Sequence, residues 1–186
     1  LLNIDLDSKF LKPEEWWAFK DLALENYENI LKESITEQNN KFEEILFKAV
    51  EEQMVSDVPI GAFLSGGIDS SLVVVMMQSI SEKPIKTFTI GFNENDYDES
   101  NYAKEIAKFL GTNHEEFIVS PKESLEIIPK LPYIYDEPFA DSSQIPTSLI
   151  SSFAKNKIKV AITGDGVDEF FLGYNRYIWA NKIYNK

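Results

Sequence analysis

The sequence predicts an α/β fold, in which a parallel β-sheet carries helices on both faces. From Pro59 onward, short apolar runs alternate with helical patterns, and this alternation is typical of parallel sheets. Two of the runs lead directly into glycine-rich loops, at residues 65–67 and 163–166. Hydrophobic residues make up 44% and charged residues 26% of the 186 residues. This is an ordinary balance for a globular protein with one core.

The part of the chain before Pro59 divides into a lead-in and a helix. Residues 1–20 are rich in aromatic side chains and are predicted to be irregular. Residues 37–54 are predicted to form an amphipathic helix, because apolar side chains recur at spacings of three and four with Glu and Lys between them.

Four apolar runs after Pro59 provide the strands of the expected sheet. The predicted strands are 60–64, 86–91, 115–119 and 159–163, and the predicted helices are 69–80, 101–110, 124–128 and 143–155. The last strand is expected to be buried. Gly111 directly follows the helix at 101–110, at the usual position of a helix C-cap.

Charge and composition exclude several classes of function. The formal net charge is −13, and without a basic patch such a chain disfavours nucleic acid as a partner. The chain has no cysteine and one histidine, His114, which excludes disulfides, thiolate catalysis and multi-histidine metal sites. No apolar run approaches the ~20 residues of a membrane span, and the first residues lack a signal-peptide pattern. We therefore expect a cytoplasmic protein without a membrane partner.

The first glycine-rich loop has the pattern of a phosphate-binding loop. Ser-Gly-Gly-Ile-Asp-Ser-Ser, at 65–71, joins a predicted strand to a predicted helix. Glycines allow close backbone approach, and the unpaired amides at a helix start attract anions. Asp69 could hold a metal that neutralises phosphate charge. The alternative is an ordinary strand–turn–helix connection capped by Asp69 or Ser70.

The second loop, Thr-Gly-Asp-Gly-Val-Asp-Glu at 163–169, also follows an apolar run. It is expected at the carboxyl edge of the sheet beside the first loop, where open α/β sheets bind their ligands. Carboxylates at such a turn can hold a divalent metal. A Gly/Asp turn that merely caps a helix is the alternative. Residues 136–147, a polar stretch bracketed by prolines, could line the same site, or its Asp-Ser-Ser could cap a helix.

Together these motifs resemble the asparagine synthetase (glutamine-hydrolysing) family, in the synthetase domain of the ATP pyrophosphatase superfamily. The similar stretches are 57–71, 87–92, 111–115, 136–147 and 163–177. The resemblance implies a Rossmann-like, adenine nucleotide alpha hydrolase-like fold. It implies ATP contacts at Leu64, Ser65, Gly66, Gly67, Asp69, Ser70, Ser71, Ile90, Thr163 and Gly164, magnesium ligands at Asp69 and Asp168, and catalytic positions at Asp165 and Tyr174 facing the acyl group or the incoming amine.

The activity implied by this resemblance is ATP-dependent amide formation in two steps. The side-chain carboxylate of aspartate attacks the α-phosphorus of ATP, which gives β-aspartyl-AMP and pyrophosphate. Ammonia derived from glutamine then displaces AMP and gives asparagine. The resemblance thus implies ATP and Mg²⁺ as cofactors and aspartate and ammonia as partners, and it allows a homodimer.

The family also has parts that this chain lacks. Its glutaminase domain begins with a nucleophilic cysteine, and this chain has none. We therefore expect residues 1–36 to be a linker from a missing glutaminase domain plus a lead-in, and residues 37–186 to be a C-terminally truncated ATP-binding synthetase domain with impaired turnover. The family's catalytic lysine is expected beyond residue 186, and Lys182 and Lys186 match no motif. Leu172 stands where the family usually has glycine. This substitution is unfavourable for the turn that the family forms before Tyr174.

Two other functions remain open from the sequence. The same fold could amidate or cyclise another carboxylate, as a sugar-acid amidotransferase, a β-lactam synthetase-like or a lasso-peptide cyclase-like enzyme would. In a different class, the chain could be a nucleotide-binding module without chemistry.

Overall fold

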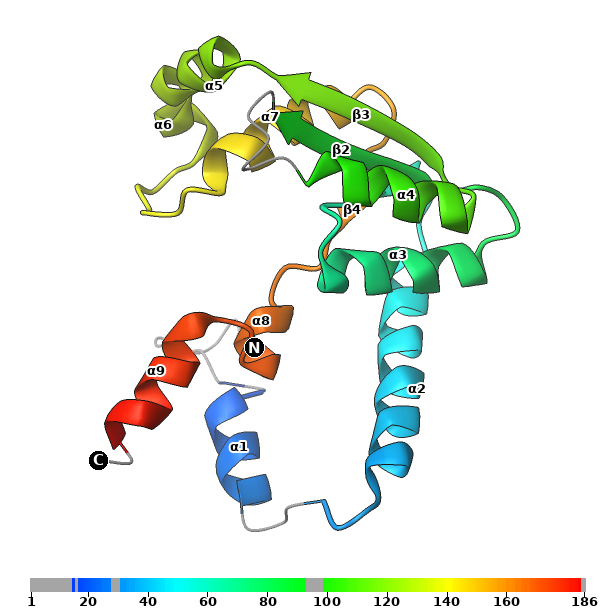
Figure 1. The fold of residues 1–186 in the computed structure, drawn as a ribbon, viewed down its shortest axis with the longest axis vertical. Coiled ribbons are helices and arrows are strands. Elements are labelled where there is room, and N and C mark those ends of the chain that lie inside the picture. Colours follow the sequence, from blue (N-terminus) through cyan, green and yellow to red (C-terminus); the bar gives the residue numbers. More distant parts are fainter. Residues whose placement is uncertain (1–14, 16, 28–30, 93–98, 185–186) are drawn as a thin grey trace, which may run out of the picture. The chain divides into compact units, whose positions relative to one another are not determined.

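A computed structural model describes residues 15, 17–27, 31–92 and 99–184 of the chain (Figure 1). The chain divides into two compact units, Leu1–Ile45 and Leu46–Lys186. The predicted division into a linker with its lead-in at 1–36 and a synthetase domain at 37–186 stays a prediction. Residues 1–14 and Lys186 lie outside the described part.

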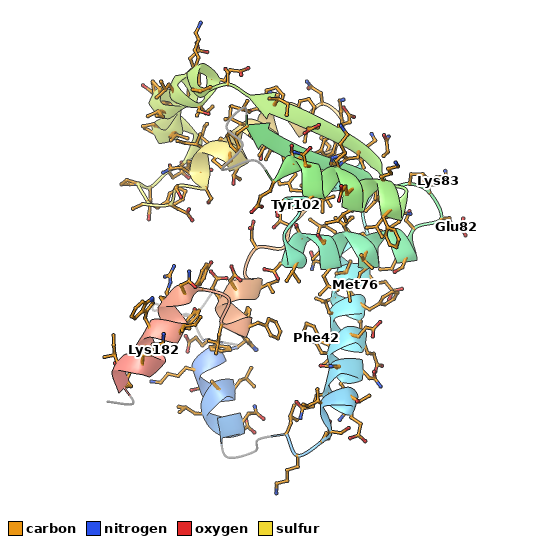
Figure 2. The ribbon with its side chains drawn as sticks, viewed as in Figure 1. Phe42, Met76, Glu82, Lys83, Tyr102 and Lys182 are labelled. Atoms are coloured by element: carbon orange, nitrogen blue, oxygen red, sulfur yellow. The ribbon has the colours of Figure 1, made fainter. Side chains whose placement is uncertain are left out.

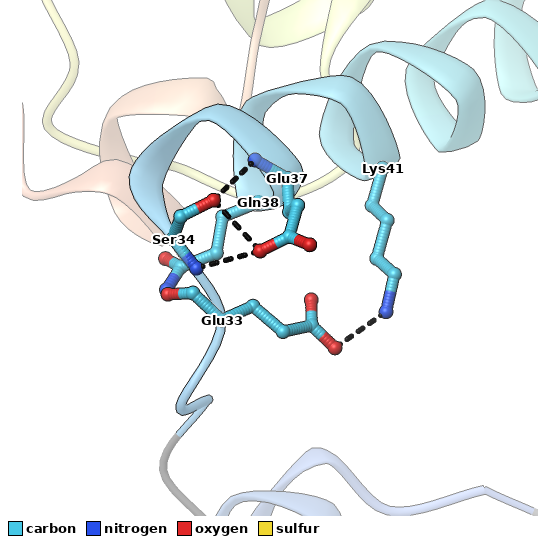
Figure 3. Close-up of polar contacts among 5 residues, drawn as sticks. All are labelled: Glu33, Ser34, Glu37, Gln38 and Lys41. Atoms are coloured by element: carbon cyan, nitrogen blue, oxygen red, sulfur yellow. Dashed lines mark hydrogen bonds and ion pairs between the residues drawn. The ribbon is translucent and has the colours of Figure 1, made fainter.

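The first unit contains α1 (Phe19–Tyr27) and the beginning of α2 (Ile35–Gln53). A capping box starts α2: the Glu37 amide donates to Ser34 Oγ at 3.3 Å, and the Glu37 carboxylate accepts from the Ser34 amide at 2.9 Å and from its hydroxyl at 2.7 Å (Figure 3). Lys41 forms an ion pair with Glu33 at 2.6 Å. The box pairs amides that would otherwise lack partners, which explains why α2 begins where it does.

The second unit is built around a four-stranded sheet with the order β3-β2-β1-β4, in which every strand pair is parallel. Its elements in chain order are β1 (Ile60–Phe63), α3 (Ile68–Ile80), β2 (Lys86–Phe92), α4 (Ser100–Leu110), β3 (Asn113–Val119), α5 (Pro121–Ile127), the 3₁₀ turn η2 (Ile128–Lys130), α6 (Leu131–Ile134), α7 (Gln144–Ala154), β4 (Val160–Ile162), α8 (Val167–Phe171) and α9 (Asn175–Tyr184).

Two apolar cores cover the two faces of the sheet. Side chains of successive strand residues point to opposite faces. Accordingly, Ala62 and Leu64 pack in a core with α3 and α4, whereas the intervening Phe63 packs in a core with Phe88 and the α7 residue Ile150. Figure 1 shows α3 and α4 side by side along the sheet. Helices on both faces and an all-parallel sheet confirm the predicted fold class.

Several sequence expectations differ from the structure in detail. The irregular stretch predicted for 1–20 is wrong at its end, because α1 already begins at Phe19. The helix expected at 124–128 begins earlier, since Ser120 and Glu123 form a capping box. The strand expected to be buried at 159–163 is shorter and only partly buried, with Val160 42% exposed. Among the described residues it lies at the edge of the sheet, so no described strand pairs with its outer side.

Within the described ranges, no helix has both the length and the apolar character that crossing a membrane would require.

Candidate functional site

A large cavity opens where the two glycine-rich loops follow the neighbouring strands β1 and β4. Its volume is about 750 Å³. The chain continues from β1 to β2 and β3 on one side of β1, while β4 lies on the other side. The order therefore reverses between β1 and β4, and ligands of open α/β sheets bind at the carboxyl ends of strands at such a switch point.

Serine hydroxyls hold the first loop in its shape. Ser65 Oγ lies 2.9 Å from Ser70 Oγ and accepts from the Gly67 amide at 3.2 Å. The Ser71 hydroxyl donates to the Gly67 carbonyl at 2.5 Å. Gly67 is the N-cap of α3 and no side chain caps it, so the alternative in which Asp69 or Ser70 caps this helix is wrong. The first amides of a helix have no partner within the helix, so this helix start suits an anion.

Gly66 lets this loop lie directly against the start of α4. Its φ is +87°, in the left-handed region. A Cβ at Gly66 would lie 2.9 Å from Cβ of Tyr102 and 3.0 Å from the Glu99 carbonyl oxygen. Tyr102 is labelled on α4 in Figure 2. Glycine is therefore required here for conformation and for space.

The two loops touch each other through Gly164. A Cβ at this position would lie 2.7 Å from the Ser70 amide nitrogen and 3.0 Å from Asp69 Cβ. The backbone after β4 thus packs on the first turn of α3 with no room for a side chain. Residues about 95 positions apart in the sequence meet at one edge of the sheet.

The second loop carries several fixed polar side chains. The Thr163 hydroxyl donates to Asp165 Oδ2 at 2.9 Å, and the Tyr174 hydroxyl donates to Glu169 Oε1 at 2.6 Å. This bond is the main cause that raises the pKa of Tyr174 to about 12 and lowers the pKa of Glu169. At neutral pH the phenol stays protonated and the carboxylate ionised. The Arg176 guanidinium lies 4.4 Å from the centre of the Tyr174 ring.

Most of the predicted site residues line this cavity. The lining includes Leu64, Ser65, Asp69, Ser70, Ile90, Thr163, Gly164, Asp165, Asp168 and Tyr174. Gly66, Gly67 and Ser71 lie in the first loop but outside the lining, where they shape the loop. Their contacts with a ligand stay a prediction, as do the roles of the lining residues.

The segment at 136–147 forms another wall, which agrees with the expectation that it lines a site. Phe139, Asp141, Ser143, Gln144, Pro146 and Thr147 belong to the lining. Asp141 Oδ1 accepts from the Ser143 amide at 2.8 Å, and this bond lowers the pKa of Asp141. Asp141 therefore shapes the turn before α7, while Ser143, at the N-cap position, makes no capping side-chain bond.

Sequence reasoning missed several further lining residues. Phe92, Glu99, Tyr135 and Glu169 also face the cavity. Glu169 directly follows Asp168 and was part of the motif, so its position in the sequence was a usable signal. Tyr135 comes from the end of α6, a helix that the apolar pattern did not reveal, and nothing in the local sequence marks it as a site residue.

The cavity is acidic, and its lining favours a cation beside an anionic ligand. Six carboxylates and no lysine or arginine occur among the described lining residues: Asp69, Glu99, Asp141, Asp165, Asp168 and Glu169. No three His, Asp or Glu side chains in the described part of the chain gather closely enough to hold a metal by themselves. A magnesium ion commonly uses one or two carboxylates together with phosphate oxygens and water. Asp69 and Asp168 both line the cavity and carry such carboxylates, and their role as a ligand pair stays a prediction.

Lys182 is not among the residues that line the cavity. Lys182 is exposed on α9, with its ammonium 5.1 Å from the centre of the Trp179 ring. Lys186 lies outside the described residues.

Comparison with known proteins identifies the family of this fold and site. The family model described as asparagine synthase matches residues 41–185. The chain belongs to the asparagine synthase family. Among curated members, it is 38% identical to a putative glutamine-hydrolysing asparagine synthetase of Methanocaldococcus jannaschii, covering 95% of this chain and 33% of that protein. It is 35% identical to asparagine synthetase 1 of Bacillus subtilis, covering 94% of this chain and 28% of that protein.

The chain therefore spans about a third of the length of these asparagine synthetases. Among solved structures, NMN synthetase from Francisella tularensis is similar with a TM-score of 0.52 and 16% identity, over 73% of this chain and 58% of that one. This structural similarity supports the fold described above for this member of the asparagine synthase family.

Proposed function

We propose that this chain is the ATP-binding part of an enzyme that forms the side-chain amide of asparagine. The aspartate carboxylate oxygen bonds to the α-phosphorus of ATP, and the bond from that phosphorus to the bridging oxygen breaks, which releases pyrophosphate. Ammonia then adds to the acyl carbon of β-aspartyl-AMP and loses a proton, and AMP leaves. Membership in the asparagine synthase family supports this reaction.

One observation supports the proposal more than any other: the close contact between the two loops. Gly164 lies against Ser70 and Asp69 with no room for a Cβ. A phosphate chain bound at the free amides of α3 would therefore lie beside the acidic loop. In this arrangement amides and serine hydroxyls bind the pyrophosphate portion, and the apolar residues Leu64 and Ile90 contact the base.

Asp69 and Asp168 would hold Mg²⁺ together with phosphate oxygens. The ion supplies positive charge that stabilises the departing pyrophosphate. Asp165, oriented by Thr163, faces the acyl centre in the proposed site. Tyr174 acts there as a hydrogen-bonding group rather than as an acid, because its raised pKa of about 12 keeps the phenol protonated.

Calorimetric titration of MgATP into the wild-type chain and into Asp69→Ala tests this proposal. We expect saturable binding to the wild type and at least about 10-fold weaker binding to the variant, since a charge-assisted contact contributes ~1.5–3 kcal/mol. Asp57→Ala is the matched control, because Asp57 is exposed before β1 and does not line the cavity.

A chain that is folded by circular dichroism and yet does not bind millimolar MgATP would contradict the nucleotide assignment. The acceptor is tested separately in the full-length parent protein. There, exchange of labelled pyrophosphate into ATP should depend on aspartate, and exchange that depends instead on another carboxylic acid would favour a same-fold amidotransferase or cyclase.

A further inference from the structure

Gly173 lies in close contact with the carboxylate of Asp168. A Cβ built at Gly173 would lie 1.7 Å from Asp168 Oδ1 and 2.6 Å from Asp168 Cγ. The Gly173 amide also donates to the Asp168 carbonyl at 3.0 Å. The carboxylate therefore occupies the space that any side chain at 173 would fill.

The requirement for glycine at 173 is spatial rather than conformational. Gly66, Gly111 and Gly166 are the described glycines with positive φ, and Gly173 is not among them. The preceding residue, Leu172, has a φ of 59° and ends α8 in the left-handed conformation that favours glycine. The turn expected before Tyr174 thus forms even though leucine replaces glycine at position 172.

The same turn also fixes the next carboxylate. After Leu172 and Gly173 the chain folds back, so that the Tyr174 hydroxyl reaches Glu169 Oε1 at 2.6 Å. Two consecutive acidic side chains at the start of α8 thus contact two consecutive residues after its end: Asp168 packs on the bare backbone of Gly173, and Glu169 accepts from the phenol of Tyr174.

We infer that Gly173 is a positioning residue, which keeps the Asp168 carboxylate in its place in the cavity wall because it has no side chain. The functional part of this inference rests on the proposed role of Asp168 as a magnesium ligand. A methyl group at 173 displaces the carboxylate, and the chain then loses affinity for nucleotide in the presence of Mg²⁺ without losing its fold.

The test compares Gly173→Ala, Asp168→Ala and the double variant by calorimetric titration of ATP over a range of Mg²⁺ concentrations. We expect Gly173→Ala to weaken MgATP binding about 10-fold. We expect the double variant to bind no more weakly than Asp168→Ala, because a carboxylate that has been removed cannot be displaced. ATP binding without metal should be the same in Gly173→Ala as in wild type, because that variant keeps the carboxylate.

Gly111→Ala is the matched control. It makes the same substitution at a glycine with φ of +71° that has no atom within 4 Å of the added Cβ. It should lower thermal stability and leave the Mg²⁺ dependence of ATP binding unchanged. Equal MgATP affinity of wild type and Gly173→Ala, or additive losses in the double variant, would overturn the inference.

Crystal structures of wild type and Gly173→Ala test the position independently of nucleotide. We expect the Asp168 carboxylate to move by more than about 1 Å, since non-bonded heavy atoms approach favourably only to ~3.5 Å. An unmoved carboxylate would overturn the positioning role. Absent MgATP binding by the wild type would instead contradict the proposed function, and the crystallographic result would still decide the positioning role.

Discussion

At the scale of residues, His114 is held by hydrogen bonding away from the cavity. Its Nδ1 lies 3.0 Å from Thr87 Oγ1, which lies 2.8 Å from Thr112 Oγ1. Its Nε2 is buried and has no partner among the described residues. Burial is the largest cause that lowers the pKa of His114, opposed by the charges of Glu116 and Glu115. The only histidine of the chain thus lies outside the cavity lining.

This environment predicts a loss of stability in mild acid. Because the pKa of His114 is lowered on folding, the unfolded chain takes up this proton first, below about pH 6.5. The contribution to stability is complete above that pH and decreases as the pH falls toward the folded pKa. Chemical denaturation at pH 7.5 and pH 5.5 should show a smaller decrease for His114→Gln than for wild type. An equal decrease would exclude His114 as its source.

At the scale of elements, local capping signals determine where several helices begin. Ser34 with Glu37 starts α2, and Ser120 with Glu123 starts α5 in the same way. The start of α3 differs, because Gly67 provides no side-chain oxygen there. At the start of α3, which lines the cavity through Asp69 and Ser70, an anionic ligand can take the place of a side-chain cap.

We predict that Ser34→Ala destabilises α2 by about 1 kcal/mol, because the Glu37 amide loses its acceptor. Ser34→Thr is the control that retains a hydroxyl. Far-ultraviolet circular dichroism during thermal denaturation should show reduced helicity and an earlier transition for alanine, and a transition near that of wild type for threonine. Identical transitions for all three chains would show that the box contributes nothing to α2.

At the scale of the whole molecule, the charge is the reason why the proposed nucleotide site should require a metal. The formal net charge is −13, and the described cavity wall carries carboxylates without lysine or arginine. The phosphates of ATP repel such a surface unless a cation lies between them. In the proposed site, Mg²⁺ and the helix amides therefore supply the attraction.

Removal of the metal should consequently weaken ATP binding strongly. In the presence of a chelator we expect the affinity of wild type for ATP to fall at least about 100-fold, which corresponds to ~2.7 kcal/mol. Added Mg²⁺ should restore it, whereas added NaCl at equal ionic strength should not. Equal affinity with and without Mg²⁺ would contradict a metal-dependent site.

Much of this architecture follows from short-range signals in the sequence. The alternation of apolar runs with helical patterns predicted the parallel sheet, because each run must bury its side chains against helices. Both glycine-rich loops were recognised because their residue types suit phosphate or metal. Short helices without strong periodicity, α6 and α8, were missed.

The sequence by itself determined the fold class and both loops, since strand periodicity, glycine and carboxylate patterns are local properties of the chain. Only the tertiary structure decided which residues share one cavity. Tyr135 and Glu99 reach its wall from helices distant in sequence from either loop. Gly164 meets the start of α3, and the carboxylate of Asp168 occupies the space beside Gly173. These contacts depend on the register of packed backbones, which no local pattern specifies.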